Sequence, residues 1–222
     1  MEEHIVKILS VEFITHDVKR FTVEKPENYS FTPGQATEVS LNKPGLKDEK
    51  RPFTFTGLND DPNLEFTIKI YSGHKGVTDT LGELKEGDEI ILHDVWGAIN
   101  YKGAGTFFAG GAGVTPFIAI FRQLYKDKKV DGNKLFFSNK TEADIILKDE
   151  FEKILGENFH NTLTREKSSK YDNRRIDEDF IKEMVKDFSK NFYICGPDNF
   201  VMDIKKALKK SGANPEAIVI ET

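Results

Sequence analysis

Cysteine is almost missing from this chain, and its scarcity limits what the protein can be. Cys195 is the single cysteine among 222 residues, so the chain forms no intramolecular disulfide and cannot hold an iron–sulfur cluster on cysteine ligands. Histidine is also sparse. The five histidines are scattered without the spacing of metal ligands, and we expect no metal site.

Strong charge and long apolar runs are missing too. The net charge of −5 argues against nucleic acid as the main partner, and no segment is apolar for long enough to cross a bilayer. The chain also lacks Gly-x-Ser-x-Gly, the Gly-Lys-Ser/Thr phosphate loop and any internal repeat. Its acidic start, Met1-Glu2-Glu3-His4, does not resemble a signal peptide, so we expect a cytoplasmic protein.

The first hundred residues alternate between apolar and polar side chains, as strands do. A chain of this length suits one large or two small domains. Short strands separated by proline and glycine signals predict a small antiparallel barrel of six strands, with one short helix at 77–84. The strand candidates are 5–13, 21–24, 35–41, 64–70 and 88–92, with a further piece at 51–54.

The second half changes character after a hinge at 101–105. Strand candidates alternate there with helical patterns, which predicts βαβ units and a parallel sheet with helices on both faces. The strands are expected at 107–109, 134–137, 159–163, 192–195 and 217–220, and the helices at 116–125, 148–155, 177–188 and 199–210.

A glycine-rich turn joins the first strand and helix of this second half. The stretch FFAGGAGVTPFIAI (107–120) reads as strand, glycine turn and helix, with Thr115 as N-cap and Pro116 at the first helical position. Such a turn lets a pyrophosphate approach unpaired backbone N–H groups. Gly111-Ala112-Gly113 lacks the third glycine of the dinucleotide fingerprint, so on this stretch alone a ligand site and a purely steric turn stay equally open.

Three short motifs follow one another along the chain. They are Arg51-Pro52-Phe53-Thr54, the turn Gly110–Pro116, and Cys195-Gly196-Pro197-Asp198. Together they resemble the ferredoxin–NADP reductase superfamily, the flavoproteins that pair a flavin-binding barrel with a nicotinamide-nucleotide domain. The resemblance implies an FAD-binding β-barrel in residues 1–101 and an NAD(P)-binding α/β domain in residues 102–222.

The resemblance also implies flavin contacts in the barrel. Arg51 would pair with a phosphate, Phe53 would lie against the isoalloxazine, and Thr54 would hydrogen-bond near its N5. The stretch IKIYSGHKGVTDTL (68–81) resembles the family's second flavin segment. The cofactor-binding candidates in the barrel are Arg51, Pro52, Phe53, Thr54, Ile68, Lys69, Gly76, Val77 and Thr78. The alternatives are an ordinary strand with a solvated Arg51 and a hairpin that runs into a capped helix.

A second set of candidates would hold the nicotinamide nucleotide. Cys195 would face the nicotinamide without any covalent role, since hydride transfer is the chemistry of the cofactors. Thr54 and Cys195 are the catalytic candidates. The nucleotide-binding candidates are Gly111, Gly113, Val114, Thr115, Pro116, Ser138, Lys140, Arg165, Cys195, Gly196, Pro197 and Asp198.

Two departures from the family pattern concern the flavin. Where many relatives show Gly-Pro-x-Gly, this chain has residues 93–97, in which only Gly97 matches. Trp96 in that stretch could be barrel core or flank the adenine side of the flavin, and we favour the core. The sequence ends at Thr222 without the aromatic residue that covers the flavin face in some relatives.

The segment after the second strand bears on the choice between NADH and NADPH. Residues 138–147, SNKTEADIIL, resemble the Asn-x-Thr-Glu-x-Asp-Ile pattern of NADH-preferring cytochrome b5 reductases. NADP-preferring relatives often show a Ser-Arg pair and a stacking Tyr, where this chain has Ser138 but Asn139 and Ile146. Arg165 and the Arg174-Arg175 pair could still reach a 2′-phosphate. We expect NADH to be preferred.

The resemblance implies an NAD(P)H-dependent flavoprotein reductase, and we expect it to be a monomer. It would pass hydride to FAD and then electrons to a separate carrier such as ferredoxin or flavodoxin, because the chain itself cannot hold an iron–sulfur cluster on cysteine ligands. The alternatives are a flavin reductase that releases free reduced flavin and a catalytically silent nucleotide-sensing module.

Overall fold

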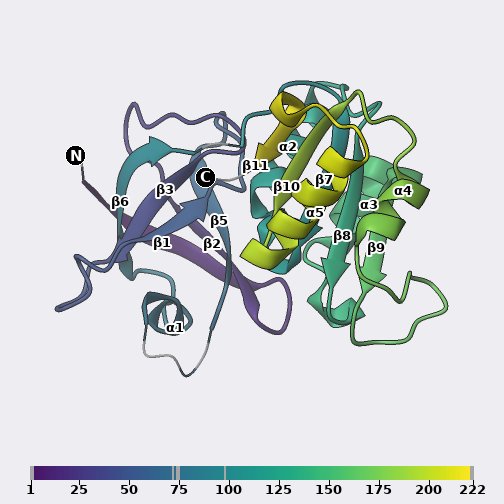
Figure 1. Cartoon of the computed structure of the whole chain (residues 1–222). Coiled ribbons are helices and arrows are strands. Elements are labelled where there is room, and N and C mark those ends of the chain that lie inside the picture. Colours follow the sequence, from purple (N-terminus) through teal and green to yellow (C-terminus); the bar gives the residue numbers. More distant parts are fainter. Residues whose placement is uncertain (1–2, 72, 74–75, 98, 221–222) are drawn as a thin grey trace. The chain divides into compact units, whose positions relative to one another are not determined.

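The chain folds as two units. The structure, a computed structural model, describes residues 3–71, 73, 76–97 and 99–220 (Figure 1). The first unit takes in residues up to Asn100 together with Thr115–Arg122, and the second takes in Tyr101–Val114 and the chain from Gln123 onward. Among the described residues, every helix is too short or too polar to span a bilayer.

An antiparallel sheet of six strands forms the first unit, in the order β4-β3-β6-β1-β2-β5. Its two outer strands meet, because Phe55 bridges Phe66 and the backbone N–H of Thr56 donates to the carbonyl of Glu65 at 2.9 Å. The sheet is therefore a closed barrel, as predicted. Its strands are β1 (His4–Phe13), β2 (Val18–Glu24), β3 (Ala36–Leu41), β4 (Arg51–Thr54), β5 (Asn63–Lys69) and β6 (Glu89–Trp96).

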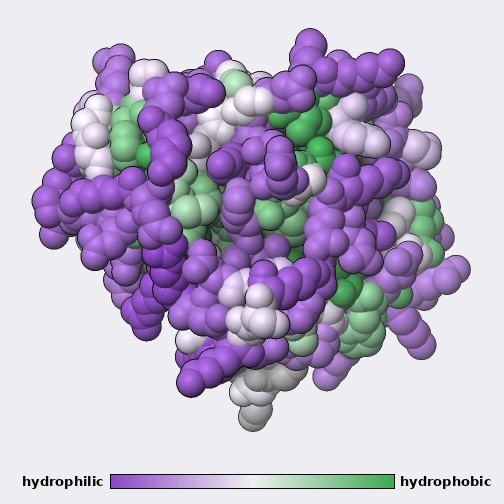
Figure 2. Space-filling model, turned by 90° about the vertical axis from the view of Figure 1, so that its right-hand side faces the viewer, coloured by the Kyte–Doolittle hydropathy of each residue, from purple (hydrophilic) through white to green (hydrophobic). Residues whose placement is uncertain are grey.

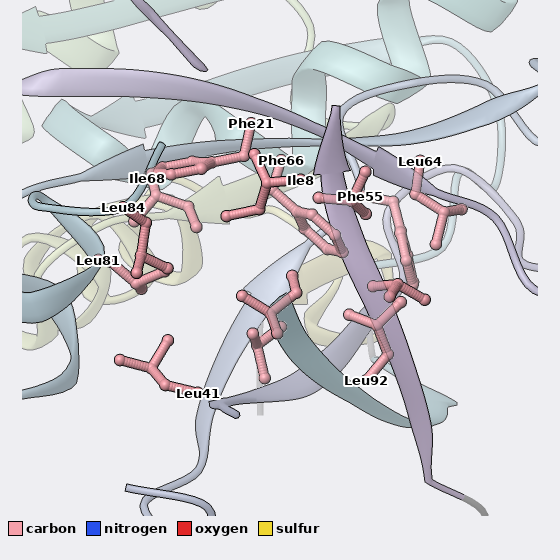
Figure 3. Close-up of a cluster of buried hydrophobic side chains, with 14 of the residues drawn as sticks. Ile8, Phe21, Leu41, Phe55, Leu64, Phe66, Ile68, Leu81, Leu84 and Leu92 are labelled. Carbon is pink, nitrogen blue, oxygen red and sulfur yellow. The ribbon is translucent and has the colours of Figure 1, made fainter. Parts of the chain in front are cut away.

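Side chains from all sides of the barrel meet in one apolar core (Figure 3). Phe55 is completely buried in this core, with its ring stacked on Phe31 at 4.1 Å and 5.2 Å from the ring of Phe66. The helix α1 (Val77–Leu81) adds Leu81 to this core. It ends at Leu81, short of the predicted Leu84, although Leu84 is buried in the same cluster.

The strand β6 extends four residues beyond the prediction. It continues from Leu92 to Trp96 because its last residues still pair with β3, with Trp96 opposite Ala36. The expectation that Trp96 belongs to the core is wrong, since the residue is 38% exposed. An exposed Asp94 hides this part of the strand in the sequence pattern.

A parallel sheet of five strands forms the second unit, in the order β11-β10-β7-β8-β9. Phe151 of α3 (Lys148–Leu155) contacts Phe159, whereas Phe180 of α4 (Glu178–Met184) contacts Phe136. Residues 136 and 159 point to opposite faces, because Phe159 pairs with Leu135, so helices cover both faces as predicted. The strands are β7 (Gly105–Gly110), β8 (Lys134–Asn139), β9 (Phe159–Leu163), β10 (Asn191–Cys195) and β11 (Ile218–Ile220).

The helices agree with the predicted ranges to within one residue except at one end. They are α2 (Thr115–Lys126), α3 (Lys148–Leu155), α4 (Glu178–Met184) and α5 (Asp198–Lys210). The helix predicted to reach Phe188 stops at Met184, because Val185 is extended and the Asp187 carboxylate instead accepts from the backbone N–H of Ser189.

Hydrophilic residues cover most of the face in Figure 2, and hydrophobic residues show there in small separate groups.

Tyr193 fixes the start of the second unit. Its fully buried hydroxyl donates to the carbonyl of Gly103 at 2.7 Å and accepts from the N–H of Lys102 at 2.9 Å. We expect Tyr193→Phe to lower the free energy of unfolding by about 1–3 kcal/mol, since both backbone groups lose a partner. Urea denaturation measures this. Tyr125→Phe is the control, because Tyr125 is 47% exposed; an equal loss in both variants would contradict the explanation.

Candidate functional site

The strand β4 carries the first candidate segment of the barrel. Arg51 lies at its start with a half-exposed side chain, which donates to the carbonyl of Lys50 at 2.6 Å and lies 3.4 Å from a Glu49 carboxylate oxygen. Phe53 packs against the barrel core, and Thr54 is buried. The strand thus presents a guanidinium, an aromatic ring and a hydroxyl in sequence, which fits a flavin phosphate and its ring system.

The second candidate segment lies on β5 and α1. Ile68 and Val77 are core side chains, so these two positions could contact a ligand through their backbone. Lys69 forms an ion pair with Asp17 at 2.6 Å. Gly76 is the N-cap of α1 and Thr78 is half-buried in its first turn. Residues 72, 74 and 75 of this segment lie outside the described residues.

The glycine turn of the second unit runs from β7 into α2 as a single 3-10 turn, Gly111–Val114. Gly111 has a φ of +53°, a region that favours glycine. The helix N-cap is Val114 rather than the predicted Thr115, because the 3-10 turn leads directly into the helix and leaves no extended residue for a side-chain cap. Pro116 lies in the first turn of the helix, as predicted.

This turn packs tightly against the second nucleotide-binding motif, which begins at Cys195. A Cβ atom at Gly113 would lie 2.5 Å from the Cα of Gly196, and closer still to the carbonyl oxygen of Cys195. Cys195 is buried at the end of β10, opposite Ala109 of β7, and Pro197 leads into α5 at Asp198. The two predicted motifs therefore meet at the carboxyl edge of the sheet, the edge at which such folds bind ligands.

The ends of β8 and β9 bring further candidates together. Ser138 lies between Gly110 and Thr162 in the register of the sheet. Beyond the strands, the backbone N–H of Arg165 donates to the carbonyl of Lys140 at 2.9 Å. These predicted nucleotide contacts, which come from distant parts of the sequence, thus share one edge of the second unit.

A cluster around Glu142 was missed by the sequence reasoning. The Glu142 carboxylate accepts from Lys148 Nζ at 2.6 Å and from the Tyr171 hydroxyl at 3.0 Å. These two hydrogen bonds lower the pKa of Glu142, and the same contact with Glu142 raises the pKa of Lys148. NADP-preferring relatives often have a tyrosine near the position of Ile146, whereas in this chain Tyr171 lies next to the segment. Tyr171 is 29 residues from Glu142 in the sequence, so no short motif indicates this contact.

Comparisons with known proteins assign both units. An oxidoreductase FAD-binding domain model matches residues 5–101, and an oxidoreductase NAD-binding domain model matches residues 107–206. The chain belongs to the ferredoxin–NADP reductase superfamily. The predictions of the two-domain fold and of an FAD-dependent NAD(P)H oxidoreductase are thereby confirmed.

Members of this superfamily with similar sequences and structures serve different systems. The reductase component of the naphthalene 1,2-dioxygenase system of Pseudomonas putida is 24% identical over 95% of this chain, which spans 66% of that protein. NADH-cytochrome b5 reductase 2 of Candida glabrata is 28% identical over 89% of this chain and 72% of its own length. The Neisseria gonorrhoeae ferredoxin NADP+ reductase structure, with bound FAD and NADP, has a TM-score of 0.86 at 20% identity and covers 99% of this chain and 98% of its own.

Proposed function

We propose that this protein is a reductase that takes hydride from NAD(P)H onto bound FAD and delivers electrons to a separate carrier protein. The observation that carries this proposal is the close contact of the Gly113 turn with Cys195 and Gly196, in a unit that an NAD-binding model matches. A Cβ atom at Gly113 would collide with the backbone of Cys195 and Gly196, so this glycine serves tight packing of the turn, whereas the open space beside Gly111 leaves room for a pyrophosphate to approach the backbone.

The residues of the chain have separate tasks in this proposal. Arg51 pairs with a flavin phosphate, Phe53 supports the ring system, and Thr54 donates a hydrogen bond near its reactive nitrogen. Cys195, a small buried residue, leaves room for the nicotinamide at the end of β10. When bound, FAD supplies the capacity to accept a hydride and to pass on single electrons. The protein contributes orientation and exclusion of water.

NADH is proposed as the preferred donor. Glu142 and Glu166 lie together after β8 and β9, where the backbone N–H of Glu142 donates to the Glu166 carboxylate at 2.8 Å. Carboxylates at this position suit a ribose hydroxyl and repel a 2′-phosphate. The positive charges of Arg165 and Lys140 instead favour a 2′-phosphate. The preference is therefore expected to be moderate.

The test is an anaerobic titration of the FAD-loaded protein with NADH and, separately, with NADPH. We expect NADH to bleach the flavin band at about 450 nm at a lower concentration than NADPH does. Bound flavin that neither nucleotide reduces would favour the nucleotide-sensing module instead. Reduced flavin that leaves the protein on dilution would favour a flavin reductase.

A ferredoxin or a flavodoxin is the proposed electron carrier. The similarity to a ferredoxin reductase component supports this class, and the similarity to cytochrome b5 reductases supports a one-electron acceptor in general. Reduction of each carrier by NADH in the presence of the protein distinguishes them. The monomeric state and the cytoplasmic location stay predictions from the sequence.

A further inference from the structure

A bulge in β6 interrupts its pairing with β3. Thr37 pairs with Val95 and Val39 pairs with Leu92, so two residues of β6, His93 and Asp94, lie opposite the single Glu38. A bulge of this kind disrupts the ladder locally and bends the strand. The backbone of His93 consequently needs partners other than those of a regular ladder.

Two buried hydroxyl groups supply these partners. The Thr37 hydroxyl donates to the carbonyl of His93 at 2.8 Å and accepts from its N–H at 3.2 Å. The Tyr29 hydroxyl donates to the same carbonyl at 2.7 Å. Thr37 is completely buried and Tyr29 is 8% exposed, so water does not readily replace either group.

The side chain of His93 is buried but has weaker contacts than its backbone. Its Nε2 lies 3.4 Å from the hydroxyl of Ser40, and its Nδ1 lies 3.7 Å from a carboxylate oxygen of Glu3. Burial lowers the pKa of His93, which keeps the ring neutral near pH 7. The backbone of the bulged residue is thus fixed by two hydroxyl groups, whereas the buried Nδ1 of its ring has no hydrogen-bond partner among the described residues.

The bulge adjoins the predicted flavin segment. Thr37 and Ala36 pair with Val95 and Trp96 on one side, and with Phe53 and Thr54 on the other. Thr37 therefore holds the bulge with its side chain and lies directly opposite Phe53 with its backbone. A change in the bulge reaches β4 through this one residue.

We infer that Thr37 is a positioning residue for flavin binding, whose hydroxyl fixes the β6 bulge and thereby the place of Phe53 and Thr54. The inference rests on the proposed function, because it assumes that β4 contacts FAD. It assigns a role in flavin affinity to a residue that touches no cofactor and lies in no recognised motif.

Thr37→Val tests the inference, because valine keeps the shape and removes the hydroxyl. We expect its dissociation constant for FAD to rise about tenfold, with a changed visible circular dichroism of the bound flavin. Thr37→Ser restores the hydroxyl and should stay within about threefold of the wild type. Thr67→Val is the matched control, since Thr67 is a buried threonine of the same barrel whose hydroxyl bonds Thr56.

The comparison of binding with stability separates positioning from a general structural effect. If Thr37→Val and Thr67→Val lose equal stability in urea and equal affinity for FAD, the inference is overturned. Should Thr37→Val not fold, Tyr29→Phe removes the second hydroxyl from His93 and is expected to weaken FAD binding about threefold. Unchanged binding in that variant would then overturn it. Wild-type protein that binds no FAD would overturn the proposed function together with the inference.

Discussion

Replacing Arg51 with methionine is expected to raise the dissociation constant for FAD about a hundredfold. The guanidinium fork pairs with two oxyanion oxygens at once, and charge-assisted hydrogen bonds of this kind are the strong ones. The side chain is half-exposed at the start of β4 and stabilises little of the fold. Unfolding of the flavin-free protein should therefore change little. Equilibrium dialysis against FAD measures the loss.

Two variants control for charge and geometry at Arg51. Lys47→Met removes another exposed positive charge just before β4, and FAD binding should stay near the wild-type value. Arg51→Lys keeps the charge without the fork, so an intermediate affinity is expected. Equal affinity of the methionine variant and the wild type would show that Arg51 is a solvated surface charge.

Gly113→Ala is expected to slow reduction by NADH about a hundredfold while FAD remains bound. The new Cβ atom would lie 2.5 Å from the Cα of Gly196, so the glycine turn and the Cys195 turn have to move apart. A displacement of about 1 Å at a site that orients a nucleotide costs on the order of a hundredfold in rate. Stopped-flow reduction of the FAD-loaded variant by NADH measures it.

Gly111→Ala is the matched control for the same turn. Among the described residues nothing lies within 4 Å of a Cβ atom at Gly111. The cost of the change is therefore the strain of holding an alanine in the left-handed conformation at φ +53°, about 1–2 kcal/mol. We expect a modest loss of stability and slower reduction than in the wild type, but much faster than in Gly113→Ala. Equal effects in the two variants would mean that close packing against Cys195 is unimportant.

Local sequence signals predicted the helices and strands correctly where a single hydrophobic pattern continued through the whole element. The strand β10 (NFYIC) is apolar on both faces, and its predicted range, 192–195, differs from the observed strand by one residue. The same reasoning failed at β6, because a bulge at His93 and Asp94 breaks the alternation on which strand prediction depends. It failed at α4 because Asp187 and Ser189 form a local turn within an otherwise helical pattern.

The candidate site was predictable to the extent that its residues form short motifs. Glycines, an arginine before an aromatic residue, and a strand end at Cys195 are visible in the sequence as contiguous pieces. Tyr171 and Glu142 are far apart in the chain and meet only because the segment after β9 folds back along the sheet. Thr37 carries no sequence signal at all, since its importance comes from a hydrogen bond across strands.

The strand order of the second unit has a consequence for synthesis on the ribosome. β7 is made first, yet one of its neighbours is β10, which is among the last segments to be translated. Until Asn191–Cys195 emerges from the exit tunnel, one side of a very apolar strand has no partner and can pair with other nascent chains. Nascent chains stalled before that segment should depend on chaperones for solubility.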